Sequence, residues 1–320
     1  MIEKTDLQAS VSAGIITEAQ AASLKALSDQ RQGARNDLNP NDEPFELFRG
    51  FNEIFIVIGF AILTSGWIGV ITFFVLRSTN IQNSIFISAS IGGVIIWLLS
   101  EYFIKKRRMV APAITLSIMF TANSFYGLAG GLSEIFMVFQ GDNSSLVLPL
   151  LLATITMLIY WFRFKVPLVL AIVAILSFAV AILIAAHTNE APDSIRDLFL
   201  LSANGPFALI TLIIGVIVFI IAMLFDMSDP HRVTRRAANG FWLHVVAAPA
   251  LVNTVALTLR KPESILSNCL LIIVMICFAV IAIVIDRRSF LIAAIGYIVV
   301  LSATVFDDGN KFFIVLFLGA

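Results

Sequence analysis

The sequence predicts an all-α membrane protein: a polytopic transmembrane helical bundle with nine to ten spans and a small N-terminal soluble helical hairpin. Two observations support this fold class. The chain of 320 residues is 59% hydrophobic and only 13% charged, whereas a soluble globular domain is about 25% charged. Its apolar residues also fall into long runs, with basic residues clustered between alternate runs. Such a chain cannot bury its apolar surface in one soluble core.

Residues 1–31 predict a cytoplasmic helical hairpin, in which Thr17 and Gln20 form a capping box at the start of the second helix. A unit this small needs support, so we expect it to rest on a cytoplasmic protein partner, a second copy of the chain or the membrane domain. Residues 32–53 are expected to form a linker and then an aromatic helix at the membrane interface. No cleavable signal peptide is expected, so the first span directs the chain to the membrane.

Residues 54–320 predict the transmembrane domain. Each apolar run is close to the roughly 17 to 25 residues that a spanning helix needs. A tenth run begins at Phe312 and stops at Ala320; at about 1.5 Å per residue it covers half of the hydrocarbon layer, so we expect the chain to be truncated inside its last span. The nine complete runs are about 54–76, 81–99, 109–128, 146–162, 166–186, 206–225, 240–259, 265–285 and 289–306.

Basic residues indicate which side of the membrane each connection faces. With a cytoplasmic N-terminus, sixteen Lys and Arg lie inside and five outside, as the positive-inside rule requires. The sequence therefore predicts a multi-pass protein of the inner membrane with its N-terminus in the cytoplasm. The residues expected to anchor the cytoplasmic side are Lys105, Lys106, Arg107, Arg108, Arg232, Arg235, Arg236, Arg287 and Arg288.

Small residues recur at every fourth position in the first two spans, a pattern that lets helix backbones approach closely in lipid. The sequence therefore predicts that these two spans pair as a tight hairpin. A weaker pattern, two similar proline-containing hairpins at 105–162 and 163–225, leaves an internal duplication open. The small residues are Ala61, Ser65 and Gly69 in the first span and Ser84, Ser88 and Gly92 in the second.

Polar residues inside the spans are the candidates for a functional cavity, because an unpaired polar group in hydrocarbon costs several kcal/mol. Pro249 frees a backbone carbonyl and can bend its helix. His244 lies about one turn inside the cytoplasmic boundary, and we expect it to bond a carbonyl or interfacial water. Ordinary packing, with amides bonded to neighbouring helices, remains the alternative to a cavity. The candidate cavity residues are Asn123, Tyr126, Glu134, Pro249 and Asn253.

The sequence shows no pattern typical of catalysis or of a bound cofactor. The spans lack a buried acidic pair, H-E-x-x-H, a nucleophile elbow and a phosphate loop. We therefore expect no catalytic, cofactor-binding or metal-binding residue and no enzyme activity. Cys269 and Cys277 share one apolar run and are expected to be small buried hydrophobic residues. The zero net charge argues against a nucleic-acid partner and leaves the lipid bilayer as the main one.

Three stretches carry a resemblance to a known group of proteins. They are "AGIITEAQAASL" at 13–24, "FRGFNEIFIVIG" at 48–59 and "TRRAANGFWLHVVAAPALV" at 234–252. With them the chain resembles an uncharacterised group of bacterial multi-spanning inner-membrane proteins of the domain-of-unknown-function type. The resemblance implies a polytopic protein of the bacterial inner membrane, from a Gram-negative species, and it carries no activity, ligand or catalytic residue.

The number of spans, the proline in the seventh span and the possible repeat favour a transporter or permease-like protein for an unidentified substrate. The alternative is a non-catalytic membrane scaffold or sensor that binds a cytoplasmic partner through the N-terminal hairpin. The two classes differ in one structural feature. A transporter should contain a cavity that reaches mid-membrane and is lined by Asn123, Asn253 or the carbonyl that Pro249 frees.

Overall fold

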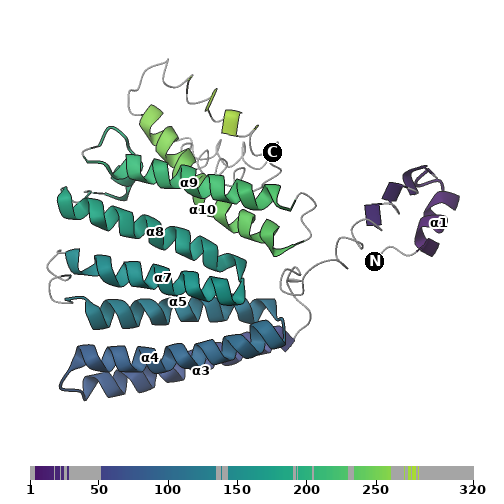
Figure 1. The fold of residues 1–320 in the computed structure, drawn as a ribbon. Helices are drawn as coiled ribbons and strands as arrows, with labels where there is room; N and C mark the ends of the chain where they lie inside the picture. The colour runs from purple at the N-terminus through teal and green to yellow at the C-terminus, as the bar shows by residue number, and fades with distance from the viewer. Residues whose placement is uncertain are drawn as a thin grey trace, which may run out of the picture.

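The computed structural model describes residues 4–17, 19–21, 23–24, 27–28, 52–134, 138, 143–189, 192, 194–203, 205–229, 234–260, 270, 273–274, 276–278 and 280. Every regular element in this part of the chain is a helix (Figure 1), which confirms the all-α prediction for these residues. The elements are α1 (Lys4–Ser12), α3 (Asn52–Leu76), α4 (Ile81–Ser100), the π-helical η1 (Glu101–Lys106), α5 (Val110–Leu132), η2 (Ser144–Leu146), α7 (Val147–Phe164), α8 (Pro167–Thr188), η3 (Ile195–Leu198), α9 (Phe207–Met227) and α10 (Arg235–Arg260).

Six of the described helices are long and apolar enough to cross a membrane, and they indicate a multi-pass membrane protein. They are α3, α4 with η1, η2 with α7, α8, α9 and α10. The helix α5 has a similar length, but polar side chains such as Asn123 and Tyr126 make it less apolar. The predicted spans at 265–285, 289–306 and from Phe312 lie almost wholly outside the described residues. The total of nine to ten spans therefore stays a prediction.

The long helices lie side by side in nearly the order of the chain (Figure 1). The pair α3 and α4 forms one side of the bundle, α5, α7 and α8 follow, and α9 and α10 form the other side. The connections from α4 to α5, from α7 to α8 and from α9 to α10 meet at the same end, as in an up-and-down bundle. We call it the basic end, and the opposite end the far end. The predicted anchors Lys105, Lys106, Arg107, Arg108, Arg235 and Arg236 lie at the basic end, whereas Arg232, Arg287 and Arg288 lie outside the described residues.

Local signals explain where several helices begin and end. Asn80 precedes α4, and its Oδ1 accepts the backbone N–H of Asn83 at 3.1 Å, which satisfies one of the free donors of the first turn. The helix α7 ends at Phe164, and the next residue, Lys165, caps it with a left-handed φ of 54°. Pro167 then opens α8, at a position where its missing N–H costs no hydrogen bond. These signals set the helix register that positions the side chains described below.

Two clusters of buried side chains hold the bundle together. The larger one joins α3, α4, α5, α7 and α8 around Tyr160 and Leu116, both fully buried. The ring of Tyr160 stacks on that of Phe120, with 4.6 Å between centroids. The second cluster joins α8, α9 and α10 and includes the alanines Ala222 and Ala247. Small side chains there let helix backbones approach closely, which compensates for the lack of a hydrophobic driving force in lipid.

The tight hairpin forms between α4 and α5, so the prediction that the first two spans pair through their small residues is wrong. Ser84, Ser88 and Gly92 are buried, but α4 turns this side toward α5. A Cβ at Gly127 or Gly130 of α5 would collide with Ala89 or Ile85 of α4. The predicted partners in α3, which are Ala61, Ser65 and Gly69, are exposed. Spacing reveals a stripe of small residues but not which neighbour the stripe faces.

The predicted capping box is present near the N-terminus. The backbone N–H of Thr17 donates to Gln20 Oε1 at 2.9 Å, and the N–H of Gln20 donates to Thr17 Oγ1 at 3.3 Å. Gly14, just after α1, has a φ of +70°, as expected for the glycine that ends a helix. The apolar side chains of Ile15, Leu24 and Leu27 are exposed. A closed hairpin over residues 1–31 therefore stays a prediction.

Candidate functional site

The main candidate site is a cavity of about 510 Å³ between α3, α4 and α5. Its volume lies within the range of roughly 300 to 1,000 Å³ that is typical of small-molecule sites. Its lining holds no charged side chain and few polar ones. The lining residues are Leu63, Thr64, Trp67, Ile68, Ile71, Thr72, Val75 and Leu76 of α3, Ile85, Gly92, Ile95, Ile96 and Leu99 of α4, and Met119, Ala122, Asn123 and Tyr126 of α5.

The polar part of this cavity lies near the centre of the membrane-spanning segments. Trp67, Gly92 and Asn123 are each close to the middle of the helix that carries them. Because α3 and α4 have the length and apolar character of spans, their midpoints fall near the centre of the hydrocarbon layer. Lipid headgroups lie about half a bilayer away and cannot pair with polar atoms at this depth.

Asn123 is held in place by a hydrogen bond to the neighbouring helix. Its Nδ2 donates to the backbone carbonyl of Ala89 in α4 at 2.8 Å. Gly92, one turn further along α4, leaves room for two other polar atoms. A Cβ on Gly92 would lie 2.6 Å from Asn123 Oδ1 and 2.9 Å from Trp67 Nε1. The glycine therefore allows the indole of α3 and the amide of α5 to meet over the backbone of α4.

Within the described residues, the indole N–H of Trp67 is buried and has no hydrogen-bond partner, as is also the case for Trp161 Nε1 and Asn239 Oδ1, which line neither cavity. Leaving a buried donor unpaired costs roughly 1 to 3 kcal/mol. Unpaired buried groups are uncommon in native proteins, and each one calls for an explanation. Trp67 was missed at the sequence level, because a tryptophan in an apolar run is ordinary and only the three-dimensional contact shows that its N–H lies unpaired beside Asn123.

A second cavity of about 350 Å³ lies on the other side of Asn123. It includes Gly93 and Trp97 of α4, Phe120 of α5 and Thr156 of α7. Asn123 therefore stands between two hollow regions, with its Nδ2 fixed on Ala89. This placement makes Asn123 the polar centre of the α3–α5 side of the bundle.

The helix α3 is fastened to the rest of the bundle at its basic end. The carboxylate of Glu53 is buried and accepts the backbone N–H of Ala111 at 3.0 Å, which caps the first turn of α5. Phe60 is also buried and meets the ring of Phe103 edge to face, with centroids 5.2 Å apart. Beyond these contacts, the part of α3 from Leu63 to Leu76 lines the cavity.

The structure brings together two of the five predicted cavity residues. Asn123 and Tyr126 line the first cavity. Glu134 is exposed beyond the end of α5, where its backbone N–H donates to Ser145 Oγ at 3.3 Å. Pro249 is exposed on α10 and Asn253 is half-buried, and neither belongs to the two cavities described above. The expectation of one shared site is therefore wrong, because α10 lies on the opposite side of the bundle from α3.

His244 has a protein partner, so the prediction of a carbonyl or interfacial water is wrong. Its side chain is fully buried, and Nε2 lies 3.0 Å from Oδ2 of Asp226 in α9. Gly240 makes this contact possible, since a Cβ there would collide with the Asp226 carboxylate and lie 3.2 Å from the carbonyl of Ala222. Asp226 is one residue from the end of α9, whereas His244 is nine residues into α10, so their spacing from the connection does not reveal the pair and the contact depends on how the two helices are offset.

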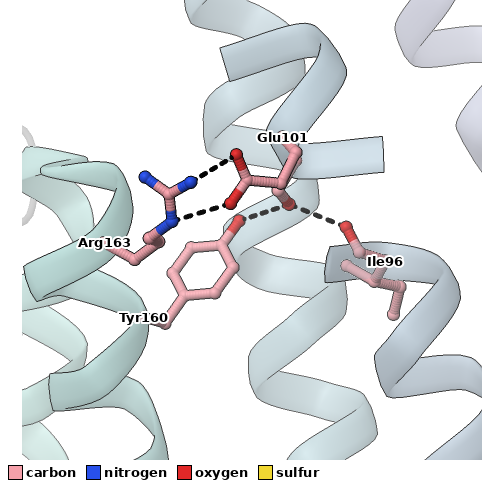
Figure 2. A network of polar contacts seen from close by, with 5 residues as sticks. Ile96, Glu101, Tyr160 and Arg163 are labelled. Carbon is pink, nitrogen blue, oxygen red and sulfur yellow. Dashed lines mark hydrogen bonds and ion pairs between the residues drawn. The ribbon is translucent and has the colours of Figure 1, made fainter. Parts of the chain in front are cut away.

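A polar network closes the basic end between α4 and α7 (Figure 2). Arg163 reaches the Glu101 carboxylate with two nitrogens, at 2.8 and 2.9 Å. Below this pair, the hydroxyls of Tyr160 and Ser100 are 2.8 Å apart, and Ser100 donates to the carbonyl of Ile96 at 2.8 Å. Glu101 opens the π-helical turn η1. The network joins two helices, and of its members only Ile96, which contributes a backbone carbonyl, lines a cavity, so we interpret these contacts as structural.

Within the described residues, no group of three or more His, Cys, Asp and Glu side chains could hold a metal ion. Cys277 is exposed, so its prediction as a buried residue is wrong, and Cys269 lies outside the described residues. No family model, no curated protein and no solved structure matches the chain. The bacterial origin and inner-membrane location implied by the resemblance therefore stay predictions, and the geometry of the cavity carries the functional argument.

Proposed function

We propose that the protein is permease-like and moves a lipid-soluble small molecule that enters the cavity between α3, α4 and α5 from the bilayer. The observation that supports this proposal is a cavity of about 510 Å³ at mid-membrane, lined almost entirely by apolar side chains. Substrate sites near the membrane centre are common in transporters. The apolar lining favours a molecule that already partitions into lipid over an ion or a polar solute.

The attachment of α3 to the bundle supports entry of a ligand into the cavity from the surrounding lipid. Leu63, Ile68 and Leu76 line the cavity and also remain exposed on the outside of the bundle. The contacts of Glu53 and Phe60 hold the basic end of α3. A helix fastened at one end can shift its remaining turns to admit a ligand at small cost, because few buried contacts must break.

Movement across the bilayer tests this proposal directly. The full chain is placed in vesicles with a long alkyl chain that carries a fluorescent nitrobenzoxadiazole group, and dithionite then reduces the probe in the outer leaflet. We expect the protein to speed the exchange of the probe between leaflets relative to protein-free vesicles. Equal rates in the two preparations would show the proposal to be wrong.

A matched pair of variants ties the movement to the cavity. Ala122→Trp fills the cavity from α5, whereas Ala61→Trp adds the same side chain at an exposed position of α3 that does not line it. We expect Ala122→Trp to slow the exchange and Ala61→Trp to leave it unchanged. If both variants exchange the probe at the wild-type rate, the cavity is not the path.

The exposed apolar side chains of Ile15, Leu24 and Leu27 favour a second candidate function, a scaffold or sensor that associates through residues 1–31. Self-association is the form that can be tested with the chain alone. Deletion of residues 1–31 should lower the oligomeric state measured by light scattering in detergent micelles. If the number of chains per particle is the same with and without residues 1–31, self-association through this segment is wrong.

A further inference from the structure

We infer that the ligand of the α3–α5 cavity is a neutral, lipid-like molecule with a hydroxyl group, and that this hydroxyl bridges Trp67 Nε1 and Asn123 Oδ1 at mid-membrane. The inference rests on the proposed function, which needs an apolar ligand in this cavity, and it adds the chemistry of the one polar group on that ligand. Three features of the cavity carry it: an unpaired donor, a neighbouring acceptor and the absence of charge.

The donor and the acceptor are both defined by their surroundings. An indole N–H can only donate, and that of Trp67 is buried without a partner. The amide of Asn123 uses its Nδ2 to donate to Ala89, so its Oδ1 is the atom that faces Gly92. Both atoms lie within 3 Å of the Cβ position of Gly92, at 2.6 and 2.9 Å. They are therefore at most about 5.5 Å apart, which is the sum of those two distances.

A hydroxyl group matches this pair because it accepts one hydrogen bond and donates another. Two hydrogen bonds of roughly 2.8 to 2.9 Å from a single oxygen span about 4.5 to 5.5 Å between the outer atoms. A ketone would accept from Trp67 but leave Asn123 Oδ1 without a donor. The acyl chain of a phospholipid would fill the cavity and satisfy neither atom.

The remaining lining explains why the ligand is neutral and apolar outside its hydroxyl. Among the described residues, no charged side chain lines the cavity, so a carboxylate or an ammonium group would be buried there without a counter-charge, at a large cost in free energy. A single bridging water would satisfy the two polar atoms but leave most of the apolar space of about 510 Å³ unfilled. An apolar molecule with one hydroxyl group satisfies the two polar atoms and also fills the apolar space.

Photolabelling in lipid nanodiscs tests the inference with two probes, a long-chain alcohol that carries a diazirine and the matching alkane without the hydroxyl. We expect the alcohol to label peptides of α3, α4 and α5 with an apparent affinity about tenfold higher than the alkane, as two hydrogen bonds to buried partners would provide. Equal labelling by the two probes overturns the inference but leaves an apolar ligand, and so the proposed function, intact. No labelling of these helices by either probe contradicts both.

Two variants and one control locate the hydroxyl. Trp67→Phe keeps an aromatic ring but removes the indole N–H, which has no partner among the described residues. It breaks no existing hydrogen bond, and because the smaller ring only enlarges the apolar space, it should reduce the preference for the alcohol without reducing labelling by the alkane. Gly92→Ala places a methyl group against both polar atoms and should abolish the preference. Gly66→Ala is the control, because a Cβ at Gly66 meets nothing within 4 Å. This variant should keep the wild-type preference for the alcohol. A Trp67→Phe protein that keeps the full preference would overturn the bridging geometry.

Discussion

The two sides of the bundle differ in how completely their helices are packed. In α10, 50% of the apolar segment is buried, whereas in α3 only 6% is. The pair α9 and α10 also has the most extensive contact between any two described helices, with alanines and Gly240 at the interface. The α3 side instead contains the cavity of about 510 Å³. The two sides therefore differ in packing density, and the proposed function assigns ligand binding to the less densely packed one.

The polar contacts differ less, because both sides hold a buried polar atom without a hydrogen-bond partner among the described residues, Asn239 Oδ1 in α10 and Trp67 Nε1 in α3. On the α10 side, the buried His244 is bonded to the partly buried Asp226. On the α3 side, Trp67 has no protein partner for its N–H. Because an unpaired polar group in hydrocarbon is costly, the first arrangement stabilises the bundle, while the second leaves a group that a ligand can satisfy. The difference can be tested by making equivalent changes on both sides.

The largest expected effect comes from adding the same side chain to a glycine on each side. Gly240→Leu would force α9 and α10 apart, since even a Cβ there collides with Asp226 and comes within 3.2 Å of the backbone of Ala222. We expect it to lower the free energy of unfolding by about 3 kcal/mol. Gly69→Leu, where a Cβ meets nothing within 4 Å, should change it little. Denaturant unfolding in micelles measures both, and equal losses would remove the contrast between the two sides.

A smaller effect is expected from removing the partner of a buried side chain on the packed side. Asp226→Ala leaves His244, whose side chain is fully buried, without this bond and should cost about 2 kcal/mol of unfolding free energy. Asp226→Asn keeps an acceptor of similar shape and serves as the control. A loss as large for Asn as for Ala would mean that the charge of Asp226, and not the hydrogen bond, stabilises the pair.

The smallest effect is expected at the point where α3 is fastened. Glu53→Ala removes the acceptor of the Ala111 N–H and should cost about 1 kcal/mol, as for the loss of a helix cap. Glu53→Gln keeps an oxygen acceptor and should cost less. Hydrogen exchange should rise in the first turns of α3 and α5 and not in α9 or α10. A rise in α10 would show that the two sides are coupled more strongly than their packing indicates.

Much of the fold could be predicted from the chain alone. The helices α4, α8 and α9 fall where long apolar runs predict them, and the capping box of Thr17 and Gln20 forms as its spacing indicates. Two of the polar residues that stand out in apolar runs, Asn123 and Tyr126, line the first cavity. These features depend on short stretches of sequence, so local propensity and periodicity are sufficient to find them.

The partners of those helices could not be found in the same way. Pro249 and Asn253 looked equivalent to Asn123 in the sequence, yet α10 places them on the other side of the bundle. The helix α4 packs most extensively on α5 and not on α3, and Gly92 faces both Asn123 of α5 and Trp67 of α3. Lipid and protein interior are equally apolar, so the hydrophobic pattern of a spanning helix does not distinguish the face that meets a helix from the face that meets lipid.

The sequence by itself therefore determined that the chain forms long apolar helices, with basic connections gathered at one end, and that a few polar residues lie among them. Only the tertiary structure decided that Trp67 and Asn123 meet over Gly92, and that Asp226 bonds His244. The physical reason is that each of these contacts depends on the rotation and distance of two or three helices. Close packing of small side chains sets those quantities, and it joins residues that are far apart in the chain.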